Sequence, residues 1–188
     1  MQRIEVYTRT DIRSPREKPG HIWYLIAMQT ARGDATAQGR EEVTATRNRA
    51  ELTALIKAMQ RMIRPCEVHV YTDSSYLASG WESGWIEKWE MDNWMTAKGT
   101  PVKNVKEWKE LRRLTEIHLM VFHTGEKGRF GNWMDFEEKR METDNAKTAE
   151  NGLNTKCERH FKETESRQTA KTVENGLNTK CERHFKEV

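Results

Sequence analysis

Two carboxylates occupy positions that a folded chain could bring together. Asp73 follows the segment 67–72 (EVHVYT), whose alternation of polar and apolar residues predicts a strand, and Glu51 lies in the first turn of a helix predicted over 48–62. A carboxylate at the end of a strand and one on an adjacent helix can share a site at the edge of a sheet. Crowded carboxylates repel each other unless protons or cations intervene, and hard oxygen ligands suit Mg²⁺ or Mn²⁺. The pair therefore indicates a divalent-metal site, and the alternative is that both are solvated surface groups.

The elements that must position these residues form a mixed α/β pattern. The helix over 48–62 is ended by Arg64-Pro65, because proline disfavours helical geometry in the residue before it. Strands are predicted over 4–8, 21–29, 35–44, 67–72 and 118–123, and further helices over 74–89, 105–114 and 130–141. Strands that alternate with helices in this way predict one α/β domain over residues 1–140, with a five-stranded mixed sheet flanked by helices.

Several short motifs resemble a known family when they are taken in order. They are T-R-N-R-A-E-L at 46–52, Y-T-D-S-S-Y at 71–76, tryptophans at 85, 89, 94 and 108, and T-A-K-G-T-P-V-K-N at 96–104. Together they resemble bacterial-type ribonuclease HI, over residues 1 to about 138 and closely between 46 and 108. The resemblance implies the ribonuclease-H-like fold and endonucleolytic hydrolysis of the RNA strand of an RNA–DNA hybrid. It also implies four carboxylates that bind two Mg²⁺ (or Mn²⁺) ions, one activating water and one stabilising the leaving oxygen.

The resemblance also implies individual roles. Glu51 and Asp73 match two of the metal-binding catalytic carboxylates, and Asp135 is the best candidate for the fourth, with Glu137 behind it. His123 matches a loop histidine that assists product release. The residues that match nucleic-acid contacts are Asn48, Arg49, Trp85, Trp89, Trp94, Lys98, Lys103 and Asn104, and Ser75 stands where the family often has a glutamine that contacts the hybrid.

The chain departs from the family pattern in its first strand. The family has an aspartate at the place where Arg9 stands in Y-T-R-T-D. Asp11 is two residues later and keeps the same strand parity, so we include it as a candidate metal ligand, although it would lie about 6–7 Å further along an extended chain. Arg9 itself could neutralise Glu51 and Asp73 and replace the metal. A second departure is the acidic segment 90–93 (EMDN), where lysines are expected and whose acids should weaken phosphate binding.

The C-terminal residues 141–188 form a predicted tail with a tandem repeat. Residues 146–163 and 170–187 differ at one position, with a period of 24 residues, which indicates a helical or flexible segment that could bind a protein partner. Each copy contains a Cys-x-x-His pair, Cys157 with His160 and Cys181 with His184. Such pairs can bind zinc, but a duplicated charged helix is the simpler interpretation.

Composition limits the remaining possibilities. No run of 18 apolar residues exists, and the charged N-terminus lacks a secretory signal, so we expect a cytoplasmic protein without a membrane span. The net charge of +3 permits nucleic-acid binding without requiring it. The sequence favours a metal-dependent nuclease. The main alternative is a catalytically impaired protein of the same fold that binds hybrid or duplex, and a third interpretation is an adaptor whose tail binds a partner.

Overall fold

A computed structural model describes residues 1–140 and 143 of the chain. Residues Met1–Arg140 form one compact unit. The predicted repeat tail, its partner and its two Cys/His pairs lie outside the described residues. Among the residues that the structure describes, no helix combines the length and the apolar content that a membrane span needs.

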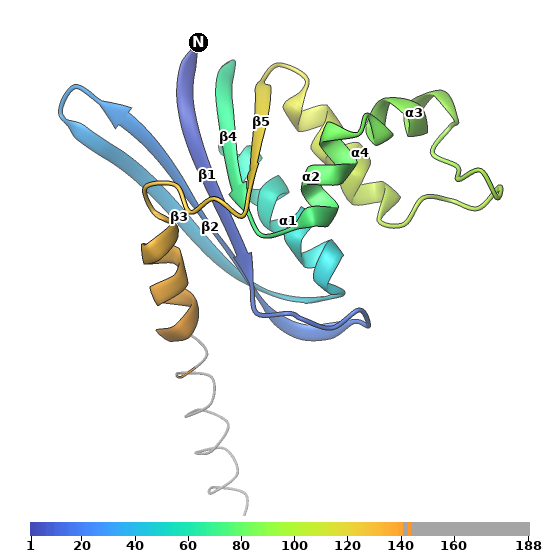
Figure 1. Ribbon diagram of the computed structural model, residues 1–188, viewed down its shortest axis with the longest axis horizontal. Coiled ribbons are helices and arrows are strands. Elements are labelled where there is room, and N and C mark those ends of the chain that lie inside the picture. The colour runs from blue at the N-terminus through green and yellow to red at the C-terminus, as the bar shows by residue number, and fades with distance from the viewer. Residues whose placement is uncertain (141–142, 144–188) are drawn as a thin grey trace, which may run out of the picture. The chain divides into compact units, whose positions relative to one another are not determined.

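The domain is built on a five-stranded mixed sheet (Figure 1). Its strands are β1 (Gln2–Thr10), β2 (Lys18–Thr30), β3 (Gly33–Ala45), β4 (Cys66–Thr72) and β5 (Leu119–Thr124), in the spatial order β3-β2-β1-β4-β5. The first three strands form an antiparallel meander, while β4 is parallel to both β1 and β5. The predicted sheet and its flanking helices are confirmed.

The helices are α1 (Arg47–Met59), α2 (Ser75–Glu82), α3 (Trp85–Met91) and α4 (Val105–Thr115), and residues 131–140 are also helical. Helix α1 begins one residue before the predicted start at 48, because the Thr46 side chain caps it by accepting a hydrogen bond from the Arg49 N–H, and it ends at Met59 rather than at 62. The prediction of one helix over 74–89 was wrong. Gly84 takes a left-handed conformation with φ +65°, which ends α2 and starts α3 in a new direction.

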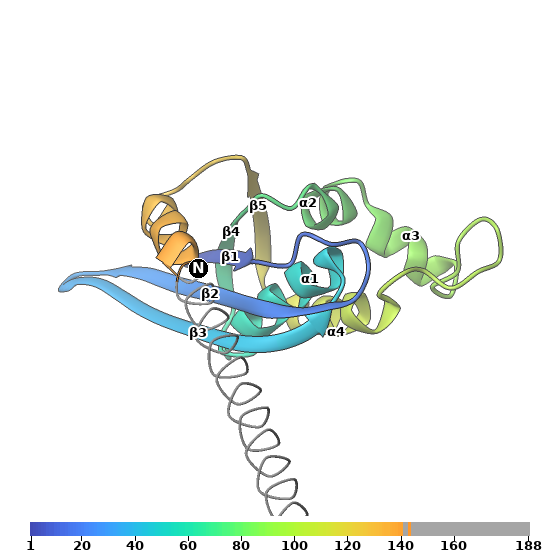
Figure 2. The same cartoon turned by 90° about the horizontal axis from the view of Figure 1, so that it is seen from below.

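The two faces of the sheet have different partners (Figure 2). The face with the even-numbered residues of β1 and β4 packs against α1 and α4 through a large apolar core that includes Val6, Val68, Leu55 and Trp108. The helix over 131–140 covers the opposite face, where Met134 packs against Tyr7 and Tyr71.

Charged and aromatic side chains share this second face. Successive side chains of a strand alternate between faces, so Glu5, Tyr7 and Arg9 of β1 lie on the same side. The parallel register places His69 of β4 beside Glu5 of β1, and Tyr71 beside Tyr7. Titratable and aromatic residues of the two strands are therefore neighbours on this face. The Tyr7 and Tyr71 rings stack with their centroids 4.8 Å apart.

Candidate functional site

Arg9 and Asp73 lie beside each other at the carboxyl ends of β1 and β4. Each comes two residues after the Tyr7–Tyr71 pair, so the parallel register brings both to the same edge. The Arg9 Nη2 atom is 3.7 Å from Asp73 Oδ2. The Arg9 side chain is 8% exposed, whereas that of Asp73 is 66% exposed. A permanently charged guanidinium is therefore buried beneath a solvent-facing carboxylate.

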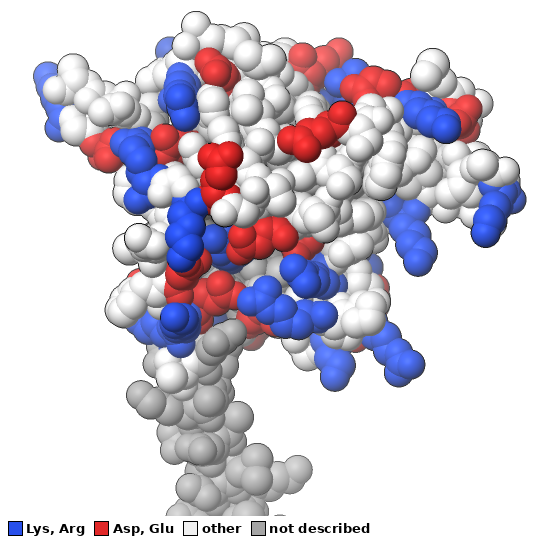
Figure 3. Space-filling view, viewed as in Figure 1, with Lys and Arg blue, Asp and Glu red and all other residues white. Residues whose placement is uncertain are grey.

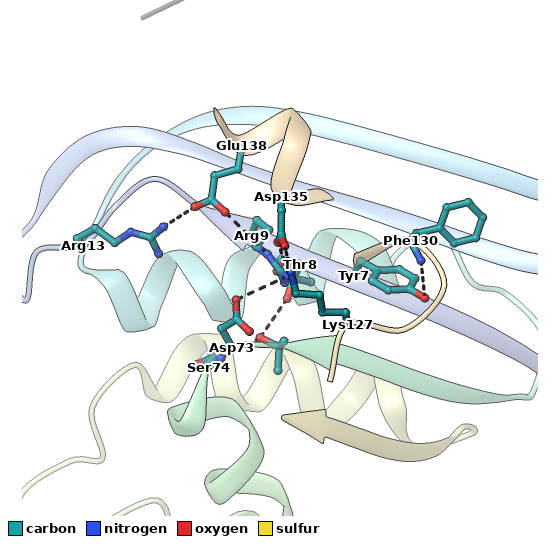
Figure 4. A network of polar contacts seen from close by, with 11 residues as sticks. Tyr7, Thr8, Arg9, Arg13, Asp73, Ser74, Lys127, Phe130, Asp135 and Glu138 are labelled. Atoms are coloured by element: carbon teal, nitrogen blue, oxygen red, sulfur yellow. Dashed lines mark hydrogen bonds and ion pairs between the residues drawn. The ribbon is translucent and has the colours of Figure 1, made fainter. Parts of the chain in front are cut away.

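The helix over 131–140 supplies two more carboxylates to Arg9 (Figure 4). Arg9 Nη2 donates to Asp135 Oδ1 at 3.3 Å, and Arg9 Nε lies 3.9 Å from Glu138 Oε2. Asp135 and Glu138 are three residues apart and so project from the same side of the helix. Arg9 Nη1 donates to the Thr8 carbonyl at 3.0 Å, while Nε is buried without a hydrogen-bond partner in the described part of the chain.

Further cations pair with two of the three carboxylates around Arg9. Lys127 Nζ lies 2.7 Å from Asp135 Oδ2, and Arg13 contacts Glu138. The hydrogen bond from Lys127, followed by that from Arg9, holds the pKa of Asp135 below its usual range.

Glu51 lies on α1 and has separate partners. Arg47 Nε donates to Glu51 Oε1 at 2.9 Å, and the Ser74 hydroxyl donates to Glu51 Oε2. The sequence left open that Arg9 could neutralise both Glu51 and Asp73. The structure pairs Arg9 with Asp73, Asp135 and Glu138, whereas Glu51 contacts Arg47 and Ser74.

Asp11 follows the end of β1, and its partner is His21 of the adjacent strand β2. Its carboxylate accepts from the His21 backbone N–H at 2.7 Å and contacts His21 Nδ1 at 2.9 Å. The structure therefore places Asp11 with His21 and not with Asp73 or Asp135, whose shared partner is Arg9. Glu137, the second candidate on the helix over 131–140, contacts Arg140 at 2.6 Å.

The residues at this edge do not fit a divalent ion as they are arranged. Among the described residues, no group of three or more His, Cys, Asp or Glu side chains is arranged to hold a metal. The Arg9 guanidinium contacts Asp73 and Asp135, two of the proposed ligands, and a second cation between them would meet its positive charge.

A hollow near Glu51 has cationic and amide side chains in its lining, which are groups that can bind an anion. Its volume is about 430 Å³, and its lining residues are Arg13, Pro15, Thr46, Arg47, Asn48, Lys103 and Asn104. Tyr76 helps to fix one wall, because its hydroxyl accepts hydrogen bonds from Asn104 Nδ2 at 3.3 Å and from Trp108 Nε1 at 2.8 Å. Figure 3 shows basic and acidic side chains interleaved at the lower edge of the domain, where β1 ends in the same view of Figure 1.

The other predicted contact residues lie around this hollow or further along the chain. Arg49 contacts Glu17 at 2.6 Å and the Thr44 carbonyl at 2.6 Å, and Ser75 is exposed at the start of α2. Trp89 and Trp94 are half-buried against the core, with Trp89 contacting the Trp108 ring at 5.6 Å between centroids. Lys98 is exposed and Trp85 is 40% exposed.

His123 lies near the end of β5, and its contacts are with Tyr71, His69 and Glu126 rather than with the carboxylates around Arg9. Its ring stacks on Tyr71 at 4.6 Å between centroids, and its Nε2 is 2.8 Å from His69 Nδ1.

Sequence reasoning missed three members of the site, namely Arg13, Lys127 and Glu138. The pairing of Arg47 with Glu51 had a visible signal, because opposite charges four residues apart on a helix are neighbours. Glu138 had the same kind of signal, since it lies one helical turn after Asp135. Lys127 and Arg13 come from loops, where spacing carries no such information.

Comparison with known proteins identifies the family. Residues 2–134 match the RNase H family, so the chain belongs to it. A ribonuclease H of Chlorobium luteolum is 42% identical over 124 residues, which cover 65% of this chain and 81% of that protein. A ribonuclease H of Caldanaerobacter subterraneus is 48% identical over 80 residues, covering 43% of this chain and 52% of that protein. The chain thus spans about half the length of several of the curated relatives that it matches.

Solved structures show the same fold. A type 1 RNase H with the type 2 active-site motif has a TM-score of 0.57 at 22% identity, and covers 71% of this chain and 68% of its own. The foamy viral protease-reverse transcriptase in complex with an RNA/DNA hybrid has a TM-score of 0.53 at 20% identity, and the match covers 71% of this chain and 18% of that one. At these identities the likeness concerns the fold alone.

Proposed function

We propose that this domain binds RNA–DNA hybrids and does not cleave them. We infer the lack of cleavage from the buried Arg9 guanidinium, which contacts Asp73, Asp135 and Glu138. In this proposal Arg9 stands where the family has its first catalytic aspartate. A cation built into the chain then compensates the carboxylates, so they act as its counter-ions.

The hollow lined by Arg13, Arg47 and Lys103 supports the binding half of the proposal. Three cationic side chains with the amides of Asn48 and Asn104 can hold a backbone phosphate, and phosphate contacts dominate nucleic-acid affinity. We assign contact with the RNA 2′-hydroxyls to Asn48 and Arg49, because this group distinguishes RNA from DNA. Ser75, Trp89, Trp94 and Lys98 complete the proposed nucleic-acid surface.

Binding is tested by the fluorescence anisotropy of a labelled RNA–DNA hybrid, with duplex DNA and duplex RNA as competitors. We expect Lys103→Ala to weaken hybrid binding and to reduce the slope of log affinity against log salt by about 0.9, the value for one lost phosphate contact. Lys57→Ala is the matched control, because Lys57 is a cation on the same domain that pairs with Glu41 at 2.8 Å. If both variants weaken hybrid binding equally, the hollow is not the phosphate-binding site.

Cleavage is tested with the same hybrid in Mg²⁺ and in Mn²⁺. We expect no product above that of a Glu51→Gln, Asp73→Asn double variant. Cleavage by the unmodified chain above this control would contradict the proposal that the domain does not cleave hybrids. It would leave the proposal that the domain binds hybrids unaffected.

Divalent-metal hydrolysis of the RNA strand is the second candidate function. Its specific support is that Asp73 and Asp135 lie at one edge of the sheet, within reach of a common group, as a family nuclease site requires. Glu51 is joined to the loop after β4 through Ser74. In this candidate the ions would be held by Glu51, Asp73, Asp135 and Asp11, and His123 would assist release. If Arg9 is the sole obstacle, Arg9→Asp gains Mg²⁺-dependent cleavage that the starting chain lacks.

A further inference from the structure

Four polar side chains form a row on the sheet face that also carries Arg9. Glu67 and His69 lie on β4, His123 lies on β5, and Glu126 lies in the loop that follows. His69 Nε2 is 2.8 Å from Glu67 Oε1, and His69 Nδ1 is 2.8 Å from His123 Nε2. His123 Nδ1 is 3.2 Å from Glu126 Oε2. His69 is 7% exposed, so its two contacts are shielded from water.

The hydrogens of this row can be assigned from its chemistry. The Glu67 carboxylate only accepts, so His69 Nε2 must carry the hydrogen of that contact. A neutral imidazole has one N–H, so His69 Nδ1 is then a bare acceptor. His123 Nε2 must therefore carry the hydrogen that lies between the two rings. Two neutral rings thus use both of their hydrogens, and His123 Nδ1 is left with a lone pair.

That lone pair faces a second acceptor, the Glu126 carboxylate. Two acceptors at 3.2 Å repel, whereas an N–H at His123 Nδ1 would turn the contact into a charge-assisted pair. A metal ion between the two rings is a poor alternative. Two nitrogens bound tetrahedrally at about 2.0–2.1 Å lie about 3.3 Å apart. The observed separation of 2.8 Å is that of a hydrogen bond.

We propose that His123 takes up a proton at Nδ1 and that this proton latches the loop after β5 through Glu126. His69 and Glu67 are positioning residues, because they direct the only free proton-accepting nitrogen of the row toward the loop. The latch is closed in the protonated state at lower pH and opens as rising pH removes the proton.

The direction in which the hydrogen bonds of the row run follows from the burial of its two carboxylates. The Glu67 side chain is 36% exposed and that of Glu126 is 66% exposed. Water therefore compensates a lost contact better at Glu126, so the neutral row keeps its hydrogen at Glu67. The other charged or titratable groups that the described residues place around this row are Tyr71 on β4, Arg3 and Glu5 on β1, and Arg129 in the loop. Arg3 is paired in register with Glu67, and Arg129 contacts Glu5 at 3.1 Å.

The loop held by Glu126 also reaches the carboxylate edge. Lys127, its next residue, contacts Asp135 at 2.7 Å, and Gly128 follows with its backbone against Tyr7 and Tyr71. Opening the latch therefore loosens the segment that carries Lys127. The inference does not depend on hybrid binding, since it concerns the protons and the loop of the chain alone.

The first test follows the imidazole nitrogens of the full chain by NMR between about pH 5 and pH 9, a range that brackets ordinary histidine titration. We expect Nδ1 of His123 to change from protonated to bare as pH rises, while both nitrogens of His69 keep their states. Amide hydrogen exchange of residues 124–129, corrected for intrinsic exchange rates, should lose about two- to fivefold protection over the same range, the size of an exposed ion pair. Titration of both rings together, or constant protection, overturns the proposal.

Glu67→Gln gives a sharper test because it changes one group and leaves the shape. An amide can donate to His69 Nε2, so the row can reverse and present a hydrogen from neutral His123 Nδ1 to Glu126. We expect this variant to keep the loop protected at high pH, so that the pH dependence disappears. Glu87→Gln, on the exposed face of α3, removes the same charge elsewhere and should leave the pH dependence unchanged. A Glu67→Gln variant with the pH dependence of the unmodified chain contradicts the assigned direction of the hydrogen bonds.

Discussion

Two charged clusters occupy one face of the same sheet and hold their positive charge in different ways. At the carboxyl edge, the Arg9 cation is permanent and lies among Asp73, Asp135 and Glu138. Further along β4, the row of Glu67, His69, His123 and Glu126 has a cation only when a histidine is protonated. The stacked Tyr7 and Tyr71 rings separate the two clusters. The comparison teaches that carboxylates on one sheet can be paired either with a cation that stays charged at every pH, as Arg9 does, or with one that is charged only when a histidine is protonated.

Removing the permanent cation should have the largest effect. Arg9→Ala leaves Asp73, Asp135 and Glu138 close together without their shared cation, with only Lys127 at Asp135 and Arg13 at Glu138 remaining. We expect a loss of about 2–3 kcal/mol in the free energy of unfolding at pH 7, below the range for fully buried pairs because Asp73 is mostly exposed. Urea denaturation at pH 7 and at about pH 4 measures it, and the loss should shrink at the lower pH as the carboxylates become protonated. A loss that is equal at both pH values would mean that packing, and not charge, explains it.

The contribution of the Tyr7–Tyr71 ring stack, which lies between the two clusters, is tested by Gly128→Ala. Gly128 has φ +57°, and an added Cβ would lie 2.5 Å from Tyr7 Oη and 2.8 Å from Tyr71 Cε1. We expect a loss of about 1–3 kcal/mol, from backbone strain and from displacement of the ring stack. Gly125→Ala is the matched control, because Gly125 also has positive φ, +77°, but open space around it. Thermal denaturation of both variants separates the two causes, and equal losses would show that the ring contact contributes nothing.

Removing the Tyr7 hydroxyl should have an intermediate effect on the free energy of unfolding, and this effect should not depend on pH. It donates to Glu5 Oε2 at 2.8 Å and accepts from the Phe130 N–H at 3.3 Å. Burial raises the pKa of the Tyr7 phenol, so the group stays protonated across the neutral range. Tyr7→Phe should cost about 1 kcal/mol at every pH between about 5 and 9. A loss confined to one end of that range, measured by urea denaturation, would contradict this constancy.

The smallest effect is expected for Lys127→Ala. Lys127 is 64% exposed, so its pair with Asp135 should contribute less than about 1 kcal/mol. Its removal lets the pKa of Asp135 rise toward the ordinary range, although Arg9 still lowers it. Because the folded-state pKa of Asp135 is depressed, this stabilisation is present above about pH 4 and is lost as pH falls below that value. A ¹³C titration of the Asp135 carboxyl measures the change, and an unaltered titration would show that Lys127 has no influence.

The fold could be predicted from the sequence because its signals are local. Alternation marked the strands, and the motifs between 46 and 108 fixed the family. The break at Gly84 was missed because one glycine inside an amphipathic segment does not reveal its φ.

The candidate site could be predicted only in part. Asp73 and Arg9 share an edge because strand order alone requires it, once the family is known. The partners of Asp11 and Glu138 depend on a turn and on a helix packed across the sheet, neither of which spacing encodes. The His69–His123 pair needs the β4–β5 register, which sets Tyr71 opposite His123. The sequence alone did not indicate that His69 and His123 are in contact.

The Tyr7–Tyr71 register has a consequence for position 9 of this chain. Because the register aligns the residues that follow Tyr7 and Tyr71, the backbone places position 9 beside Asp73. A substitution at position 9 therefore changes the charge beside Asp73 directly, while the register of β1 and β4 is set by residues before it. The electrostatics of this end of the sheet thus depend on one side chain whose place is set by its neighbours.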